Sequence, residues 1–486
     1  MKTNTLDFDA QALREKILDL AMRGKLVQQD PDDEPASVLL EKIKAEKEQL
    51  IKEKKIKKTK PLAPIADKEK PFEIPDSWEW VRLGEVIKPE VHKKPERDYL
   101  YLDIASVDNT INQVVNPQNI DISKNKVASR ARQVLENNDI LFSVVRPYLK
   151  NIAMVPNTKE YKIGSTGFYV IKPFSQIDRK FIFYLVLSKY VINGMTRKMK
   201  GDNSPSIRKG DLEQYLIPLP PLSEQSRIAA KIAQLFALLR KVESSTQQYA
   251  KLQTLLKSKV LDLAMRGKLV EQDLHDEPAS VLLEKIKAEK EQLIKEKKIK
   301  KSKPLPPITD EEKPFDIPDS WEWVRLGEVI TILRGGSPRP IKKYLTNDPN
   351  GINWIKIGDS EATSQYIEHA AEKIIPEGLN KTREVHKGDF LLSNSMSFGR
   401  PYILKIDGAV HDGWLILSNY EQLFNIDYLY YLLSSTFINQ QFIALATGST
   451  VKNLNRERVA NTIAVIPPLE EQKRIVKKIK LLYKLM

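Results

Sequence analysis

The chain has 486 residues, a formal net charge of +14 at pH 7 and no cysteine, which excludes disulfides, thiolate metal sites and cysteine nucleophiles. Its length suits two to four domains that each bury a core, and its positive charge favours an anionic partner. Because no apolar run approaches the about 18 residues of a membrane span and the N-terminus MKTNTLDFDAQALREK does not resemble a signal peptide, we expect a soluble cytoplasmic protein with no membrane contact.

A segment near the N-terminus recurs in the second half of the chain. Residues 18–87 and 261–330 differ at 8 of 70 aligned positions, and their offset of 243 residues is half the chain length. The strings IPLPPLSEQSRI and AVIPPLEEQKRI match at an offset of 247. We call the repeated parts the frame, and the unlike stretches 88–222 and 331–468 the first and second inserts. The sequence is thus a head-to-tail duplication in which two near-identical frames carry two different inserts.

The first repeated element is a helix predicted at 37–58, with Ser37 as its N-cap and with Glu and Lys three or four residues apart. It returns at 280–301. Residues 41–60 carry a net charge of +5, and so do residues 284–303. The Lys-rich end, KEKKIKK, is compatible with a solvated helix face, with a contact to DNA phosphates and with an acidic partner protein.

A Pro-containing linker follows each of these helices and ends at a Trp-Glu-Trp string. Trp78 and Trp80 in the first frame match Trp321 and Trp323 in the second. Paired tryptophans could stack on bases, but residues that are identical beside two unlike inserts are better explained as anchors. We therefore predict that they hold each insert on its frame.

Both inserts have the composition of mixed α and β domains. The predicted strands are apolar runs near Gly or Pro: DILFSVV at 139–145, STGFYVIKP at 165–173, DFLLSNS at 389–395 and WLILSNY at 414–420. Two further apolar stretches, 180–193 and 425–446, predict buried helices. Because these elements occupy equivalent positions in the two halves, we expect a shared fold with different surface residues.

Between the inserts, residues 223–264 predict one long helix, because apolar residues recur in alternating steps of four and three. A Pro-Pro pair precedes it and Gly267 follows it. Such an apolar seam, roughly 60 Å long at 1.5 Å per residue, needs a partner helix. The helix predicted at 467–486 stops at Met486 and matches only the first half of the rod, whereas the N-terminal residues match the second half. We therefore predict a circular repeat with two antiparallel long helices.

The sequence contains no common catalytic motif. It has no G-x-x-x-x-G-K-[ST] loop, no Gly-rich turn typical of a methyl-donor site and no Asn/Asp-Pro-Pro-aromatic tetrad. The five histidines are scattered without an H-x-x-x-H pair, so we expect no bound metal. The pattern indicates a chain that binds rather than catalyses.

Polar and basic residues near turns of the inserts are the remaining candidates, since Arg and Asn read base edges while Lys and Ser mostly hold phosphates. Ordinary surface loops are also polar, which is the competing explanation for each residue. The first insert carries a net charge of +8 and the second +1, so the second would depend on a local basic patch. The candidates in the first insert are Arg146, Tyr148, Lys150, Arg197, Lys198, Lys200, Asn203, Ser206, Arg208 and Lys209. Those in the second are Arg334, Arg339, Lys342, Lys343, Asn394, Ser395, Ser397, Arg400, Ser449, Thr450, Lys452, Asn453, Asn455 and Arg456.

Several strings together resemble the specificity (S) subunits of type I restriction-modification systems. They are IPLPPLSEQSRIAAKI and IPPLEEQKRIVKKI, LDLAMRGKL and IPDSWEWVRLGEV in both frames, and DILFSVVRPYL and DFLLSNSMSFGRPYIL in the inserts. The resemblance implies an α+β fold with two mixed α/β target-recognition domains, separated by two antiparallel long-helix (coiled-coil) conserved regions in a pseudo-two-fold circular repeat. The implied segments are 1–60 (helical part of the distal conserved region), 61–222 (target-recognition domain 1), 223–303 (central conserved helical region), 304–466 (target-recognition domain 2) and 467–486 (C-terminal helix of the distal conserved region).

In that family each target-recognition domain reads one half of a bipartite DNA site. The resemblance implies a double-stranded DNA-binding chain that docks two adenine-N6 methyltransferase (M) subunits and the restriction (R) subunits, in bacterial defence against foreign DNA. Catalysis would lie in those partners, so we expect no cofactor on this chain, and S-adenosylmethionine, ATP and Mg²⁺ in the partner subunits. The alternative is a coiled-coil protein-interaction scaffold with non-specific nucleic-acid binding, whose DNA affinity would not depend on the insert.

Overall fold

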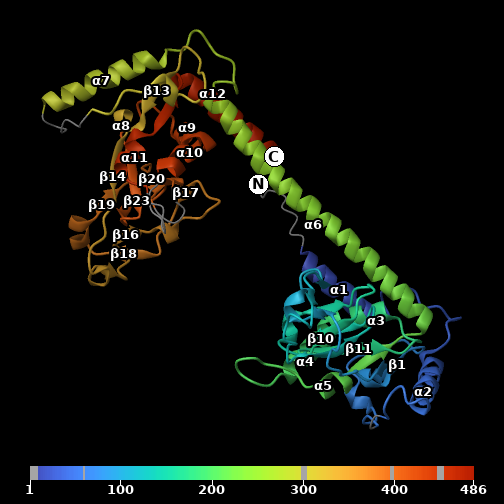
Figure 1. Ribbon diagram of the computed structural model, residues 1–486. Helices are drawn as coiled ribbons and strands as arrows, with labels where there is room; N and C mark the ends of the chain where they lie inside the picture. Colours follow the sequence, from blue (N-terminus) through green and yellow to red (C-terminus); the bar gives the residue numbers. More distant parts are fainter. Residues whose placement is uncertain (1–8, 59–60, 297–303, 395–398, 446–453) are drawn as a thin grey trace. The chain divides into compact units, whose positions relative to one another are not determined.

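The computed structural model describes residues 9–58, 61–296, 304–394, 399–445 and 454–486. The chain divides into two compact units, Met1–Thr246 (unit 1) and Gln247–Met486 (unit 2), each with one frame and one insert. Helix α6 (Leu222–Met265) is continuous and contributes one half to each unit (Figure 1). The two units thus follow the duplication, while the five-segment division remains a prediction.

In unit 1 the frame supplies helices and the strand β1, and the insert supplies two four-stranded sheets. The frame elements are α1 (Ala10–Met22), α2 (Ala36–Lys52) and β1 (Glu79–Arg82), and β1 pairs antiparallel with β12 (Leu216–Leu219) at the end of the insert. The insert sheets have the orders β6-β3-β10-β7 and β2-β11-β8-β9. Their strands are β2 (Ile87–Lys88), β3 (Tyr99–Leu102), β6 (Gln118–Ile120), β7 (Ala131–Leu135), β8 (Ile140–Ser143), β9 (Ile152–Met154), β10 (Lys162–Ser165) and β11 (Phe168–Pro173). A hairpin of β4 (Val107–Asp108) and β5 (Gln113–Val114) and the helices α3 (Arg179–Leu187), α4 (Lys189–Lys198) and α5 (Lys209–Glu213) complete the unit.

Unit 2 repeats this arrangement. Its frame holds α7 (Ala279–Lys295), α12 (Leu469–Leu485) and β13 (Glu322–Arg325), and β13 pairs antiparallel with β24 (Ile463–Ile466) at the end of the second insert. Its insert sheets have the orders β14-β23-β20-β21-β17 and β15-β18-β16-β22-β19. Their strands are β14 (Thr331–Arg334), β15 (Leu345–Thr346), β16 (Ile352–Ile355), β17 (Tyr366–Ile367), β18 (Glu372–Ile374), β19 (Arg383–Val385), β20 (Phe390–Ser393), β21 (Pro401–Leu404), β22 (Gly408–Val410) and β23 (Trp414–Ser418). The helices are α8 (Leu326–Val329), α9 (Ile426–Leu433), α10 (Thr436–Leu445) and α11 (Arg456–Asn461).

The two inserts share one fold, as predicted. The order β2-β11-β8-β9 in unit 1 matches β14-β23-β20-β21 in unit 2. Single main-chain bonds match too: Val144 N donates to Gly167 O at 3.0 Å, and Asn394 N to Gly413 O at 2.9 Å. The strands β8, β11 and β20 are buried along their whole length, which is why they are mostly apolar and lack a polar alternation.

The tryptophans anchor insert and frame in both units, as predicted. The Trp78 Nε1–H donates to the buried carboxylate of Glu224 on α6 at 2.8 Å, and Trp321 donates to Glu471 on α12 at the same distance. Trp80 makes an edge contact with Tyr190 of α4, at 6.3 Å between ring centroids. One tryptophan therefore binds the frame helix while its neighbour packs on the insert.

The circular repeat is also confirmed. In unit 1 the guanidinium of Arg14 on α1 pairs with Glu243 of α6, at 2.8 Å for its longer hydrogen bond. In unit 2 the Tyr483 hydroxyl of α12 donates to Lys257 O of α6 at 3.2 Å. Each half of α6 thus has its own partner helix, one from each end of the chain.

The structure corrects three details of the helices. Helix α2 begins at Ala36 with Pro35 as its cap, so Ser37 is not the N-cap, and Ala36 N instead donates to Ser77 O at 2.9 Å. The stretch 180–193 is two helices rather than one, because Ser188 ends α3 and caps α4. The stretch 425–446 is likewise divided, into α9 and α10.

The apolar seam of α6 is buried only toward its ends. Ile228 and Ile232 are fully buried and Val260 is 7% exposed, whereas Val242 is 44% and Leu256 50% exposed. The middle of the helix therefore presents apolar side chains to solvent. Within the described ranges, no helix combines the length and apolar character needed to cross a bilayer.

Candidate DNA-recognition surfaces

In the first insert, a tight turn after β8 brings two of the predicted stretches together. Arg146 N donates to Pro205 O, and the Arg146 guanidinium donates to Asn203 O, both at 2.9 Å. Arg146 and Lys150 have positive φ angles of 48° and 53°, which L-residues seldom adopt. Between them, Tyr148 is 46% exposed on a 3₁₀ turn. The turn and the segment around Asn203 therefore form one continuous surface with an aromatic ring in it.

The β4–β5 hairpin extends this surface, and sequence reasoning missed it. Asn109 Nδ2 donates to Leu149 O at 2.8 Å, and Asn112 Nδ2 donates to Lys150 O at 3.0 Å. Asn112 also has a positive φ, of 54°. The only advance signal was the turn composition of Asp108-Asn109-Thr110, which does not say which strand end the hairpin touches.

The other candidates of the first insert differ in how far their side chains are engaged within the protein. Lys150 lies 3.5 Å from Glu15 of α1, and Lys209 pairs with Glu90. These two cations therefore help to hold the insert together or on its frame. The rest are placed as follows: Arg197 donates to Asn193 O, Lys198 lies over the Tyr215 ring, Lys200 and Ser206 form a backbone bridge, and Arg208 N donates to Asp211.

In the second insert, Asp412 lies within reach of polar and basic side chains from two segments, 334–339 and Asn394. The Asn394 Nδ2–H donates to the Asp412 carbonyl at 2.8 Å, and Arg334 Nε–H to the same oxygen at 3.3 Å. The Ser337 hydroxyl donates to Asp412 Oδ1 at 2.9 Å, and the Arg339 guanidinium lies 3.6 Å from Oδ2. The structure thus brings Arg334, Arg339 and Asn394 together around a residue that sequence reasoning missed.

The electrostatics of Asp412 keep it ionised. Partial burial raises its pKa, but the Ser337 hydrogen bond and the charges of His411, Arg334 and Arg339 outweigh burial and lower the pKa overall. Asp412 is therefore a fixed negative charge at the base of a basic loop.

The remaining candidates of the second insert fall into three groups. Lys342 and Lys343 are exposed on a 3₁₀ turn, and Arg400 N donates to the Ser393 hydroxyl at 3.1 Å. Asn455 caps α11, whose first residue is Arg456. Ser395, Ser397, Ser449, Thr450, Lys452 and Asn453 lie outside the described residues.

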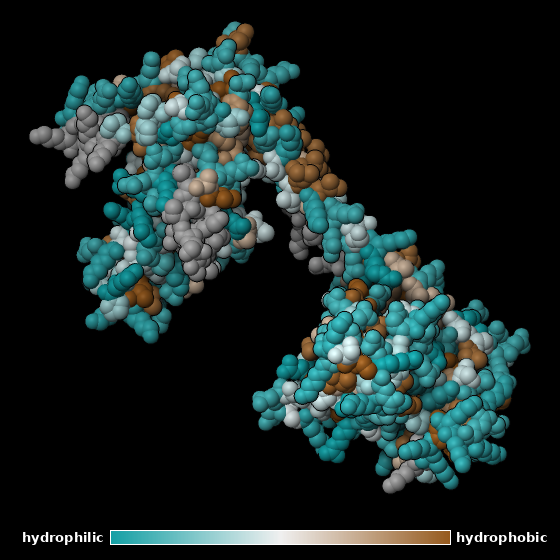
Figure 2. Space-filling view, viewed as in Figure 1, coloured by the Kyte–Doolittle hydropathy of each residue, from teal (hydrophilic) through white to brown (hydrophobic). Residues whose placement is uncertain are grey.

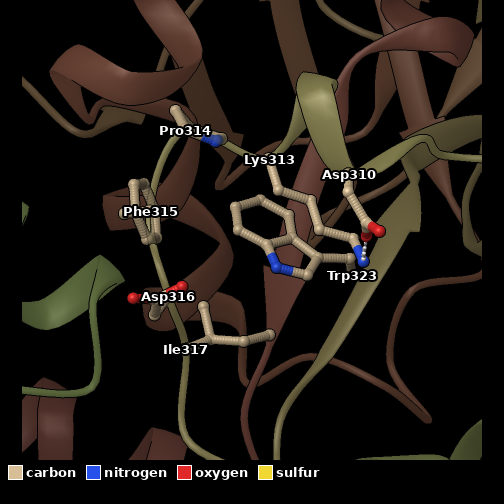
Figure 3. A pocket seen from close by; sticks show the side chains of 7 residues that line it. All are labelled: Asp310, Lys313, Pro314, Phe315, Asp316, Ile317 and Trp323. Atoms are coloured by element: carbon tan, nitrogen blue, oxygen red, sulfur yellow. Dashed lines mark hydrogen bonds and ion pairs between the residues drawn. The ribbon is translucent and has the colours of Figure 1, made fainter.

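Each frame also carries an open hollow that contains none of these candidates. In unit 2 it measures about 620 Å³, with Phe315, Ile317 and Trp323 as its apolar lining and the ion pair of Asp310 with Lys313 at its edge, 2.6 Å apart (Figure 3). The matching hollow of unit 1 measures about 650 Å³. The hollows belong to the duplicated frame, and the polar turns belong to the inserts. Within the described ranges, no three metal-ligating side chains are grouped to hold an ion.

The comparisons with known proteins agree with this division. The model of the type I restriction modification DNA specificity domain matches residues 75–253 and 318–486, one copy in each half. The EcoAI specificity subunit of Escherichia coli is 37% identical over 377 residues, an alignment that covers 68% of this chain and 64% of that protein, slightly less than two thirds of its length. The EcoEI specificity subunit of Escherichia coli is 33% identical over 445 residues, covering 80% of this chain and 73% of that protein.

Solved structures agree as well. The HsdS subunit from Thermoanaerobacter tengcongensis is 28% identical, with a TM-score of 0.55 over 86% of this chain and 92% of that one. A chain from a structure of the assembly and conformational transition of a type I R-M system is also 28% identical, with a TM-score of 0.62 over 85% and 92%. The chain belongs to the family of type I restriction-modification DNA specificity subunits.

Proposed function

We propose that this chain is the DNA-specificity subunit of a type I restriction-modification complex, and that each insert reads one half of a bipartite site in double-stranded cytoplasmic DNA. One observation carries the proposal: two inserts with the same sheet order present different polar turns on near-identical frames. Two domains that recognise different half-sites can share one scaffold, but they need different contact residues.

The insert surfaces have the chemistry for this role. In the first insert, Arg146, Asn203 and exposed Tyr148 lie on one continuous surface of a segment with a net charge of +8. In the second, the basic residues are concentrated around Arg339. Phosphate contacts would set the register on the duplex, and the Arg and Asn side chains would contact base edges. Because α6 has no break between its two halves, we expect a constant number of unread base pairs between the half-sites.

The duplicated frame has the character of a protein-docking surface. Apolar side chains are exposed along the frame helices, at Leu238, Val242, Leu252, Leu255 and Leu256 of α6 and at Leu481 and Leu485 of α12. Figure 2 shows hydrophobic surface along the long helix. Contiguous apolar surface on a protein usually marks an interface. Because each unit carries such a stripe and one hollow, two identical partners would find equivalent sites, which supports docking of two M subunits.

Catalysis is assigned to the partners. The chain would bind and orient DNA, with the target adenine of each half-site flipped into the pocket of an M subunit. S-adenosylmethionine would be held by the M subunits, and ATP and Mg²⁺ by the R subunits that complete the complex. The scaffold alternative is not favoured, because the family match includes both inserts and not only the helices.

The test is co-expression of the chain with its cognate M subunits, followed by sequencing of N6-methyladenine in the host DNA. We expect one split motif with a fixed spacer and one methylated adenine in each half. Cells that express the M subunits without this chain are the control and should show no such motif. A single uninterrupted motif, or methylation that does not depend on this chain, would overturn the proposal.

A further inference from the structure

The second insert concentrates its positive charge in one short segment. Its net charge is +1, yet Arg334, Arg339, Lys342 and Lys343 lie within ten residues of one another. Arg339 lies beside Asp412 with 84% of its side chain exposed. The segment Arg334–Lys343, here called the arginine loop, is therefore where this insert can meet a polyanion.

The arginine loop is held rigidly at its base. Gly335 N donates to Trp414 O at 2.9 Å and Gly336 N to Val410 O at 3.2 Å. A Cβ added to Gly335 would lie 2.3 Å from His411 O, and one added to Gly336 would lie 2.8 Å from Lys381 O. Only glycine allows the backbone to pass this close, so the chain is held at Gly335 and Gly336, three residues before Arg339.

Asp412 orients the end of the loop. One of its oxygens accepts the Ser337 hydroxyl at 2.9 Å, and the other lies 3.6 Å from the Arg339 guanidinium. At this distance and exposure the ion pair is weak, and most of the guanidinium fork remains accessible to a ligand. Arg334 differs, since its Nε–H already donates to the Asp412 carbonyl. Arg339 thus lies beside a carboxylate while most of its guanidinium donors remain available to a ligand.

We propose that Arg339 reads a guanine in the half-site of the second insert, with Asp412 as the positioning residue and Lys342 and Lys343 as phosphate contacts. A guanidinium donates two parallel hydrogen bonds to the O6 and N7 atoms of guanine, which no other base presents in the major groove. The exposed ammonium groups of the two lysines are suited to phosphates, which carry no sequence information. This inference rests on the proposed function.

The test uses the complete methyltransferase complex with variants of the full chain. In Arg339→Ala, one position of one half-site should change from guanine to any base, with a loss of discrimination of about tenfold to hundredfold at that position. Arg339→Lys should lose the same discrimination while it retains most of the affinity, because lysine keeps the charge but not the fork. Lys342→Ala should weaken binding to all sequences alike and reduce the slope of log affinity against log salt by roughly 0.9.

Two further variants separate positioning from folding. Asp412→Asn should reduce discrimination at the same single base position and leave methylation of the other half-site unchanged, which a general folding defect would not do. Arg383→Ala is the matched control, because Arg383 is an exposed arginine of the same insert on β19, outside the arginine loop. It should leave every position unchanged.

The outcomes distinguish this inference from the proposed function. If the unmodified complex methylates no split site, the proposed function fails. If it methylates a split site but Arg339→Ala leaves all base preferences intact, or lowers affinity uniformly as Lys342→Ala does, the assignment of Arg339 is wrong.

Discussion

The hydrogen bond from Trp78 to Glu224 provides a sharp test of how the frame holds its insert. Both side chains are buried, at 3% and 1% exposure, and the donor–acceptor distance is 2.8 Å. Trp78→Phe removes the indole N–H, so one carboxylate oxygen of Glu224 loses its hydrogen-bond donor. A hydrogen bond to a charged group contributes about 1.5–3 kcal/mol, and the smaller ring leaves a gap that costs about 1 kcal/mol more. We therefore expect a loss of about 3 kcal/mol in the free energy of unfolding.

Urea unfolding of the full chain, followed by far-ultraviolet circular dichroism, measures this loss. Trp321→Phe removes the equivalent bond to Glu471 and should lower the stability of unit 2 by the same amount. The loss of stability caused by Trp78→Phe should become smaller as pH falls. A protonated Glu224 side chain is neutral, and burying it without the Trp78 donor costs less than burying the carboxylate. In the double variant Trp78→Phe/Glu224→Met both members of this hydrogen bond are gone, so part of the stability should return. The return should be incomplete, because Gln29 also donates to Glu224 and loses that acceptor. A loss below about 0.5 kcal/mol in both single variants, or a double variant as unstable as the sum of its parts, would refute the reasoning.

Three further outcomes are expected. Gly24→Ala and Gly267→Ala should each lower the thermal unfolding midpoint by a similar amount, because both glycines have positive φ, of 66° and 65°, and an added Cβ would lie 2.4 Å from a proline ring carbon. Burial raises the pKa of Glu224 and of Glu471 above the ordinary value of 4.5, so the contribution of these two groups to the free energy of unfolding should fall as pH rises from 4.5 through their raised pKa values. Urea titrations of the chain and of a variant with Gln at both positions should show this as a pH-dependent difference between the two proteins. Tyr148→Ala should weaken binding of the methyltransferase complex by roughly tenfold when only the first insert's half-site is intact, without lowering chain stability, as DNA-binding and thermal unfolding assays can check.

Much of the fold was predictable because it follows from local patterns. The strands β8, β11, β20 and β23 coincide with apolar runs, since strands covered on both faces need no polar alternation. The circular repeat followed from the alignment of the two halves alone. The N-cap of α2 could not be predicted from local sequence. The expected serine cap is replaced by a main-chain hydrogen bond from Ala36 to Ser77, 41 residues away along the chain.

From the sequence we could choose the stretches that carry the candidate residues, but not which of those residues contact one another. The pairing of Arg146 with Asn203 joins residues 57 positions apart, and that of Arg334 with Asp412 joins residues 78 apart. Residue type gives no sign of such contacts, which depend on how the strands are ordered in the sheets. Asp412 was missed for this reason, since a single Asp-Gly pair in a loop usually indicates only a turn.

Exchange of the first insert tests the central claim most directly. Residues 88–222 would be replaced by the corresponding insert of another specificity subunit, and the chimera co-expressed with the same M subunits. Sequencing of N6-methyladenine should show that one half of the split motif changes, while the other half and the spacer length stay the same. A change in both halves, or in neither, would contradict the account.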